Sequence, residues 1–592
     1  MASFLRYLMS TSLLFILPLF HAIPTNCFSS TQPLCHDNES SALLQFKESF
    51  DRNVNACNGP FDYPKTASWK LEGVNKDCCS WDGVECDEDT GHVIGLNLSS
   101  SCLYGSMASN SSLFRLVHLQ RLNLAYNDFN FSQIPNGFGN LSKLTYLNLS
   151  NSFFWGQVPP NFSELSKLSS LDLSHNFMLY LISLKSLVQN LTSLEDLRLS
   201  NVQISSPMLE ILSNLSGLTT LHLISCRLHG EFPVGIFKLQ KLKDLKASNN
   251  QDLTGYLPEF YSSTPLKSLS LTGTSFFGKV PASIGNLDSL NEVHFGSCNF
   301  SGLIPPSLGN LTQLTTLDLF NNSFIGVIPS SFSNLLFLNY LDLSGNQLSG
   351  SIPSSFGNLT QLSFLDFSYN SFMGHIPSSL SNLISMGYLD FSHCQFSGSI
   401  PSSFGKLVSL YYLDFSYCQL SGLIPSSIGN LTQLVVLDFS DNSFMGQIPS
   451  SLSNLISLNY LAFSNNQFSG SIPSAFGNLT RLTVLKLSYC FIRSLKPSSL
   501  SLSWLEKLSK LHIFSFKGIN LETKIPSSLA NLTQLSILSM ASDELTGQIP
   551  SWLGNLTQLT MLILPYNKLQ GSIPLSILNL RNLKHSTFAQ IT

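Results

Sequence analysis

The chain has 592 residues, of which 43% are hydrophobic and 11% charged, and its 31 basic and 35 acidic residues leave a net charge of −4. It contains neither a basic stripe nor a run of like charge, which argues against nucleic acid as a partner. Length alone would suggest about four domains. A regular internal repeat, described below, instead predicts one elongated unit for most of the chain.

Residues 1–22 have the pattern of a secretory signal peptide. Arg6 precedes a largely apolar run from Leu8 to Phe20, which is too short for a membrane-spanning helix. We expect cleavage near Ala22, although Phe20 departs from the usual preference for small residues before a cleavage site. A buried terminal strand or helix is the alternative.

Seventeen Asn-x-Ser/Thr sequons support export. Most of them follow the repeated proline, in a Gly-Asn-Leu-Thr segment on the expected outer side of the molecule. We therefore expect a glycosylated outer surface. The predicted sites are Asn38, Asn110, Asn140, Asn190, Asn214, Asn310, Asn358, Asn430, Asn478, Asn531 and Asn555.

The cysteines form two groups. Those near the start have no C-x-x-C spacing and a secreted context, so they predict disulfides rather than a metal site; Cys27 is left over. This first group contains Cys35, Cys57, Cys78, Cys79, Cys86 and Cys102. The later five fill a position that is otherwise asparagine, where a thiol acts as a small weak donor; they are Cys226, Cys298, Cys394, Cys418 and Cys490.

The middle of the chain repeats every 24 residues, with an Ile-Pro or Val-Pro pair in each unit from Pro281 to Pro473. The unit 338–358, LNYLDLSGNQLSGSIPSSFGN, places Leu341 and Leu343 at alternate positions of a short strand, so both enter the interior. Asn346 can pair turn backbone groups with the next unit. About twenty such units fill residues 93–579. No unit can bury its apolar face alone, so stacking as a solenoid is predicted.

Residues 23–92 precede the repeats as a short cysteine-rich cap. We expect a helix over about 39–50, with Asp37 or Asn38 as its N-cap and Leu43, Phe46 and Phe50 on one side. Ser68-Trp69 and the run Cys-Cys-Ser-Trp-Asp-Gly-Val-Glu-Cys at 78–86 follow. This cap and the L-x-G-x-I-P repeats resemble those of plant extracellular leucine-rich-repeat proteins, and most closely the receptor-like proteins of the Cf disease-resistance type.

The resemblance implies an α/β solenoid, that is, a leucine-rich-repeat superhelix with a parallel concave β-sheet and a disulfide-bonded N-terminal cap. It implies the pairs Cys35–Cys78 and Cys79–Cys86, and we add Cys57–Cys102 as a weaker guess. It also implies recognition of an extracellular peptide or protein ligand in defence or development. Signalling would pass through receptor-like kinase co-receptors, at the outer face of the plasma membrane.

Members of that family continue through a cysteine-bearing C-cap, an acidic stretch and a membrane span. Residues 580–592 instead read as an incomplete repeat without C-cap or transmembrane segment, so we expect a truncated product or fragment. A secreted binding or inhibitor protein of the cell wall, similar to polygalacturonase inhibitors and found in the apoplast, is the alternative. Two irregular units, 176–202 and 490–519, are read as tolerated loop insertions, with a hinge or binding loop as the alternative.

The outward strand positions carry the functional hypothesis. Carboxylates at one position are flanked by aromatic side chains, a combination that suits a peptide with apolar and basic groups. The alternative for the carboxylates is that L-D-L-S is merely the repeat consensus. The predicted ligand-binding residues are Tyr340, Phe364, Asp366, Tyr369, Tyr388, Asp390, His393, Tyr412, Asp414, Tyr417, Asp438 and Tyr460.

An internal duplication supports this choice. Residues 357–405 and 429–477 differ at ten of 49 positions, and six of the ten changes fall on outward strand positions. Two sequons, Asn97 and Asn148, point to the concave side near the start, whereas no outward strand position from 339 to 489 carries a sequon. We therefore expect the ligand to bind across that window.

Catalysis is not expected. Neighbouring aspartates resemble the carboxylate pair of a retaining glycosidase, but six equivalent carboxylates on an open face provide no differentiated acid and no water-excluding cleft. The chain also lacks a kinase Gly-rich loop and an H-R-D run. We predict no catalytic residues, no metal and no cofactor.

Overall fold

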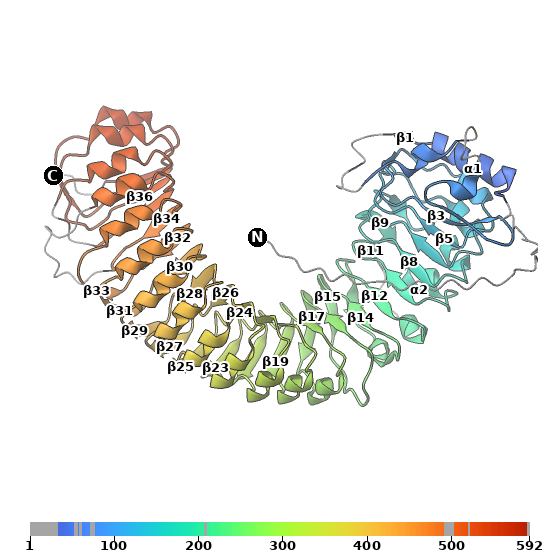
Figure 1. Ribbon diagram of the computed structural model, residues 1–592, viewed down its shortest axis with the longest axis horizontal. Helices are drawn as coiled ribbons and strands as arrows, with labels where there is room; N and C mark the ends of the chain where they lie inside the picture. Colours follow the sequence, from blue (N-terminus) through green and yellow to red (C-terminus); the bar gives the residue numbers. More distant parts are fainter. Residues whose placement is uncertain are drawn as a thin grey trace, which may run out of the picture.

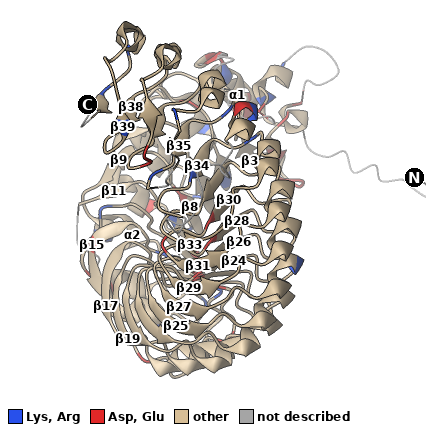
Figure 2. Cartoon of the chain, turned by 90° about the vertical axis from the view of Figure 1, so that its left-hand side faces the viewer, with Lys and Arg blue, Asp and Glu red and all other residues tan. Residues whose placement is uncertain are grey.

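The computed structural model describes residues 34–52, 57, 62–70, 77–205, 210–490, 502–518, 521 and 523–588. The chain forms an arc, with the cap and first repeats at one end and the last repeats at the other (Figure 1). The strands of one long sheet line the inner edge of the arc (Figure 1). The short helices stack in a column of their own, and charged residues are sparse over the molecule (Figure 2).

The long sheet has 22 strands, which pair in chain order from β2 against β3 to β38 against β40. The first pair is antiparallel, and every later pair is parallel. The later pairs are parallel because each repeat makes one full turn of the solenoid, so every strand starts at the same edge of the sheet. The strands are β2 (Val84–Cys86), β3 (Val93–Asn97), β5 (Arg121–Asn123), β6 (Tyr146–Asn148), β8 (Ser170–Asp172), β10 (Asp196–Arg198), β12 (Thr220–His222), β14 (Asp244–Lys246), β16 (Ser268–Ser270), β18 (Glu292–His294), β20 (Thr316–Asp318), β22 (Tyr340–Asp342), β24 (Phe364–Asp366), β26 (Tyr388–Asp390), β28 (Tyr412–Asp414), β30 (Val436–Asp438), β32 (Tyr460–Ala462), β34 (Val484–Lys486), β35 (Ile513–Ser515), β36 (Ile537–Ser539), β38 (Met561–Ile563) and β40 (His585–Thr587).

A second row of short strands follows the turn of most repeats. It forms separate sheets of two, three and eleven strands. These strands are β1 (Asp51–Arg52), β4 (Leu103–Tyr104), β7 (Trp155–Gln157), β9 (Met178–Leu181), β11 (Gln203–Ile204), β13 (His229–Glu231), β15 (Asn250–Gly255), β17 (Thr274–Gly278), β19 (Asn299–Leu303), β21 (Ser323–Gly326), β23 (Gln347–Gly350), β25 (Ser371–His375), β27 (Gln395–Gly398), β29 (Gln419–Gly422), β31 (Ser443–Gly446), β33 (Gln467–Phe468), β37 (Thr546–Gly547) and β39 (Lys568–Leu569).

The helical side of the repeats consists almost entirely of 3-10 helices. The α-helices among the described residues are α1 (Asp37–Glu48) in the cap and α2 (Leu184–Val188) in the first irregular repeat. Each regular 3-10 helix follows the repeat proline, whose fixed φ suits this entry. The 3-10 helices are Lys65–Ser68, Cys78–Ser80, Ser112–Arg115, Asn136–Asn140, Pro160–Glu164, Glu210–Asn214, Val234–Lys238, Ala282–Asn286, Pro306–Asn310, Ser330–Asn334, Ser354–Asn358, Ser378–Asn382, Ser402–Lys406, Ser426–Asn430, Ser450–Asn454, Ser474–Asn478, Ser503–Lys507, Ser527–Asn531, Ser551–Asn555 and Leu575–Asn579.

The repeat consensus explains the core. In β22, Leu341 is fully buried between Tyr340 and Asp342, and it pairs in register with Leu365 of β24. Leu338, Leu343 and the residues equivalent to them are buried as well, so leucines and phenylalanines of successive repeats form one continuous apolar interior. The predicted leucine-rich-repeat solenoid with a parallel concave sheet is therefore confirmed.

A ladder of asparagine side chains ties the turns of neighbouring repeats together. Asn370 donates from Nδ2 to the carbonyl oxygens of Leu343, Phe367 and Ser368 at 2.8–3.2 Å. Its Oδ1 accepts from the backbone N–H of Leu348 at 2.9 Å. At four of the five positions where cysteine replaces asparagine, the thiol keeps the link to the preceding repeat. Cys394 Sγ, for example, lies 3.2 Å from the carbonyl oxygen of Phe367. Burial raises the pKa of the Cys226 and Cys418 thiols to about 12, so both stay protonated.

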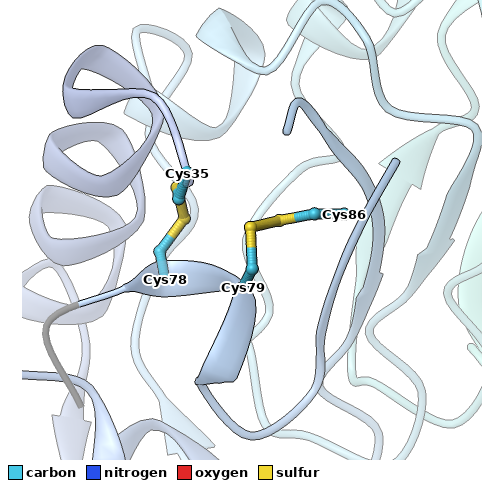
Figure 3. A group of neighbouring side chains, drawn as sticks. All are labelled: Cys35, Cys78, Cys79 and Cys86. Carbon is cyan, nitrogen blue, oxygen red and sulfur yellow. A yellow bond between two sulfur atoms is a disulfide. The ribbon is translucent and has the colours of Figure 1, made fainter. Parts of the chain in front are cut away.

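The cap is joined by three disulfides, Cys35–Cys78, Cys79–Cys86 and Cys57–Cys102, the pairs given above. Figure 3 shows the Cys35–Cys78 bond, in which Cys35 lies just before α1, and the Cys79–Cys86 bond beside it. The four sulfur atoms of these two bonds lie within 4.8 Å of one another, and each is bonded to another sulfur.

Two tryptophans complete the cap. Trp69 stacks on Trp81 with ring centroids 5.6 Å apart, and its Nε1 donates to the carbonyl oxygen of Asp82 at 3.0 Å. Leu43, Phe46 and Phe50 are buried as expected. The expected N-cap was wrong, because α1 begins at Asp37 with His36 as a cap that makes no side-chain hydrogen bond. Asp37 and Glu39 instead lie in the first turn, where a carboxylate favours the helix dipole.

The structure describes the first irregular repeat in full and the second only in part. Residues 176–202 contain β9 and α2, so the insertion there forms a short α-helix. The second insertion falls largely on 491–501, outside the described residues. The signal peptide also lies outside them. Within the described ranges, no helix is long and apolar enough to cross a membrane.

Candidate recognition surface on the concave sheet

Three columns of side chains run across the concave face from β22 to β30. They arise because one repeat position always projects from the same point of the parallel sheet. The aromatic column is Tyr340, Phe364, Tyr388 and Tyr412. The carboxylate column is Asp342, Asp366, Asp390, Asp414 and Asp438. The turn column is Tyr369, His393 and Tyr417, each three residues beyond its aspartate.

The rings of the aromatic column stack face to face. Tyr340 and Phe364 have centroids 4.3 Å apart, Phe364 and Tyr388 4.4 Å, and Tyr388 and Tyr412 4.2 Å, with interplanar angles of 9–13°. Val436 follows Tyr412 in register and ends the stack. The predicted residue Tyr460 therefore stands on the same face but outside the stack.

Stacking decides which part of each ring a ligand can meet. The faces of the inner rings are covered by their neighbours, so the column presents ring edges and tyrosine hydroxyls. Ring edges carry partial positive charge and pack against oxygen atoms and apolar groups, and the hydroxyls donate or accept hydrogen bonds. The column therefore suits an extended chain lying across the strands better than a sugar or base stacked on a ring face.

The carboxylate column is more buried than its outward strand position indicates. Asp366, Asp390 and Asp438 are 7–9% exposed. One oxygen of each aspartate accepts the backbone N–H two residues on; in Asp414 this bond to Ser416 is 2.7 Å. These bonds hold the end of each strand, so the aspartates have a structural role in addition to any role in binding.

The second oxygen of several aspartates faces a tyrosine hydroxyl. Tyr412 donates to Oδ2 of both Asp390 and Asp414 at 3.4 Å, and Tyr460 donates to Oδ2 of Asp438 at 2.9 Å. Burial and the neighbouring carboxylates raise the pKa of Asp366 and of Asp414 to about 7. Burial is also the main cause that raises the pKa of Asp342 and Asp438. Asp366 and Asp414 therefore change their charge near neutral pH.

The turn column is the exposed part of the surface. Tyr369 is 60% exposed and Tyr417 54%, and both stack on His393, with centroids 4.1 and 4.3 Å apart. All three residues have φ of 52–53°, in the left-handed region that bulky side chains seldom occupy. This backbone turns their rings away from the interior and toward solvent.

Two further residues belong to this surface. Tyr411 is half exposed and lies 6.4 Å from Tyr388, over Gly387, where a Cβ would come within 2.9 Å of its ring. Its outward strand position could have identified it. Lys486 of β34 lies over the Tyr460 ring, 5.1 Å from its centroid, and donates to the hydroxyl at 3.0 Å. That contact joins side chains of neighbouring strands, and no pattern in the sequence predicts it.

The region around these columns is strongly acidic. Residues 280–480 contain nine Asp or Glu but a single Lys or Arg, Lys406, in a chain whose net charge is only −4. Lys406 lies in a 3-10 helix and not on the sheet. An acidic face with few basic groups attracts a cationic ligand.

The predicted glycosylation sites are all exposed. Eight of them, from Asn140 to Asn555, are the last residues of 3-10 helices and so lie off the concave face. Asn38 lies in α1, and Asn190 follows α2. Attached glycans at these positions would leave the three columns open.

Family models confirm the repeat class. A leucine-rich repeat region matches residues 95–295 and 388–546, which is more than half of the chain. A leucine-rich repeat matches 312–372, and a leucine rich repeat N-terminal domain matches 36–87. The chain belongs to the leucine-rich repeat family.

Within that family, the chain is similar to plant receptor-like proteins. It is 38% identical over 227 residues to Receptor-like protein 6 of Arabidopsis thaliana, covering 35% of this chain and 22% of that protein. It is 39% identical over 223 residues to Receptor-like protein Cf-9 of Solanum pimpinellifolium, covering 36% of this chain and 25% of that protein. The matches thus span about a quarter of the length of these relatives.

Solved receptor ectodomains share the fold. The Arabidopsis receptor kinase HAESA, crystallised with the peptide hormone IDA and the co-receptor SERK1, is 31% identical, with a TM-score of 0.78 and 93% of each chain covered. A TDR receptor structure is 30% identical, with a TM-score of 0.68 and 80% of each chain covered. The resemblance predicted from the cap and the repeats is confirmed.

Proposed function

We propose that this chain is the extracellular ligand-recognition region of a plant receptor-like protein, and that its ligand is a peptide or an extended segment of a protein. The observation that carries the proposal is the continuous surface formed by the aromatic, carboxylate and turn columns. It offers hydroxyls, ring edges and carboxylates at regular intervals of about 4.8 Å, the strand spacing. An extended peptide can meet such a surface residue by residue.

The chemistry of the surface favours a ligand with basic and apolar side chains. A Lys or Arg side chain would pair with the second oxygen of an aspartate, and apolar side chains would pack against Tyr369, Tyr411 and Tyr417. Receptor-like kinase partners would carry the signal, as the resemblance to receptor-like proteins implies. The resemblance favours defence over development.

The test is a binding measurement. A random peptide library is selected on the purified protein, and the enriched peptides are measured against the wild type and against Tyr388→Ala/Tyr412→Ala/Asp414→Asn. The three changes remove two aromatic edges and one charge but retain an Oδ1 at position 414 that accepts the backbone N–H of Ser416. We expect at least a tenfold loss of affinity, about 1.4 kcal/mol.

A matched control carries Ser379→Ala and Ser427→Ala, on the 3-10 helices away from the columns. It should bind the same peptides as the wild type. Equal affinity of the triple variant and the wild type would contradict the placement of the site, and failure to enrich any peptide would contradict the ligand class.

A further inference from the structure

A cluster of large apolar side chains is exposed far from the concave columns, on the short sheet formed by β7, β9 and β11 and on the turns that precede β7 and β9. We call it the lateral patch; it consists of Phe131, Phe153, Trp155, Phe177, Met178 and Tyr180, each 40–65% exposed. In β9, Leu179 and Leu181 point inward and Met178 and Tyr180 outward. Met178 and Tyr180 are therefore exposed by the alternation of the strand itself and are not part of the core.

Two of these residues are larger than their equivalents in later repeats. Trp155 lies three residues beyond the asparagine-ladder position, where later repeats have either serine (Ser349, Ser397 and Ser421) or smaller apolar side chains (Ile325, Met373 and Met445). Phe153 stands where three of those repeats have glutamine. Exposed apolar surface of this kind marks a place that another group covers in the mature protein.

A sequon lies within the patch. Asn130, Phe131 and Ser132 form Asn-Phe-Ser, and the Asn130 residue is exposed. The Phe131 ring packs edge-to-face on Phe153 with centroids 5.8 Å apart. The carbonyl oxygen of Ser132 accepts the backbone N–H of Trp155 at 3.1 Å. The attachment point for a glycan and the exposed rings are thus direct neighbours.

We propose that the lateral patch is the docking surface for the chain's own N-linked glycan on Asn130. The C–H faces of pyranose rings pack on aromatic rings, and sugar hydroxyls bond to amides. The exposed amides of Gln133 and Gln157 lie on the same outer face, in register beside Trp155 and Tyr180. The six patch side chains are uncharged, which suits a neutral carbohydrate.

A covalently attached glycan occupies the patch more readily than a free glycan of the same composition would. A glycan tethered one strand away has a high effective concentration at the patch, so weak contacts suffice to hold it. A second sequon also lies beside an exposed ring: Asn299 of β19 pairs in register with the exposed Phe277 of β17.

Tryptophan fluorescence gives a direct readout. Trp155 is 45% exposed, whereas Trp69, Trp81 and Trp504 are at most 4% exposed and Trp552 is half-buried. Quenching by acrylamide, compared with that of a Trp155→Phe variant, therefore reports on the patch. The protein is expressed in eukaryotic cells that add high-mannose glycans, and an endoglycosidase then trims each glycan to one sugar without any mutation.

We expect glycopeptide mass spectrometry to find Asn130 occupied, and trimming to raise quenching of Trp155 at least twofold. Asn130→Asp, which tolerates the φ of 48° at this position, should be quenched as strongly before trimming as the wild type is after it. Asn299→Gln, away from Trp155, should behave as the wild type.

The inference rests on passage through the secretory pathway, which is part of the proposed function, and the experiment separates the two. Glycans on Asn310 and Asn358 with Asn130 bare would overturn the inference alone. The inference would also be overturned if Asn130 were glycosylated and trimming its glycan left the quenching of Trp155 unchanged. That result would favour a protein partner as the occupant of the patch. If every sequon were bare, both the inference and the extracellular assignment would fail.

Discussion

Asn370→Ala is expected to lower the free energy of unfolding by about 2–4 kcal/mol, because it leaves several buried backbone groups without a partner. The affected groups are the carbonyl oxygens of Leu343, Phe367 and Ser368 and the N–H of Leu348. Asn370 is 7% exposed, so water cannot easily replace the lost bonds. Because a repeat protein can unfold in parts, the measurement is the denaturant midpoint followed by two independent probes.

The chain supplies the control for this prediction. Asn370→Cys introduces the residue that Cys394 provides one repeat later, and should cost less than alanine, because the thiol keeps the link to the preceding carbonyl. The reverse change, Cys394→Asn, should be neutral or stabilising. A loss of less than about 0.5 kcal/mol for Asn370→Ala, within the range of ordinary surface changes, would show that the ladder does not hold the repeats together.

The second large effect concerns pH. Burial raises the pKa of Asp366 and Asp414 from 3.8 to about 7, so the folded protein holds protons between about pH 4 and 7 that the unfolded chain releases. Stability should therefore increase as the pH falls from 8 to 5. Asp366→Asn/Asp414→Asn keeps the Oδ1 acceptors for Ser368 and Ser416 but carries no charge.

We expect the double variant to be more stable than the wild type at pH 8 by roughly 2–4 kcal/mol, and by clearly less at pH 5, where the folded wild type has taken up both protons. Chemical denaturation at the two pH values measures this difference, and groups that titrate in both proteins cancel from it. A gap of the same size at both pH values would mean that the carboxylates are ionised throughout, which would contradict the raised pKa.

Much of the fold could be predicted from the sequence, because the same 24-residue unit recurs many times and each copy packs in the same way. Leu341 and Asn346 have the same surroundings in unit after unit, so their roles could be read from one unit. The N-cap of α1 was not predictable in this way, since the cap occurs once. The 3-10 form of the helical side depends on the tight turn after each proline and on contacts between repeats.

The candidate surface was only partly predictable. The alternation of strand side chains placed Tyr388 and Asp390 on one face. It could not show that the rings stack and so cover their own faces, or that Asp390 is nearly buried, because both depend on the distance between neighbouring repeats. Lys486 lies within the predicted window, but its contact with Tyr460 depends on side-chain length and direction and so could not be predicted.

The most direct test of the recognition surface uses the internal duplication. Residues of the second copy are placed into the first copy's outward positions, where the same backbone is known to accommodate them. The face variant carries Phe364→Val, Tyr369→Asp, Asp390→Ala and His393→Asn, and the control variant carries the differences that lie elsewhere, namely His375→Gln, Met386→Leu, Cys394→Asn and Ser403→Ala.

The measurement is the affinity of both variants for a peptide selected on the wild type. If the columns form the recognition surface, the face variant should lose affinity at least tenfold, and the control variant should bind as the wild type does. Equal binding by the face variant, or an equal loss in the control variant, would contradict the assignment of this surface to ligand recognition.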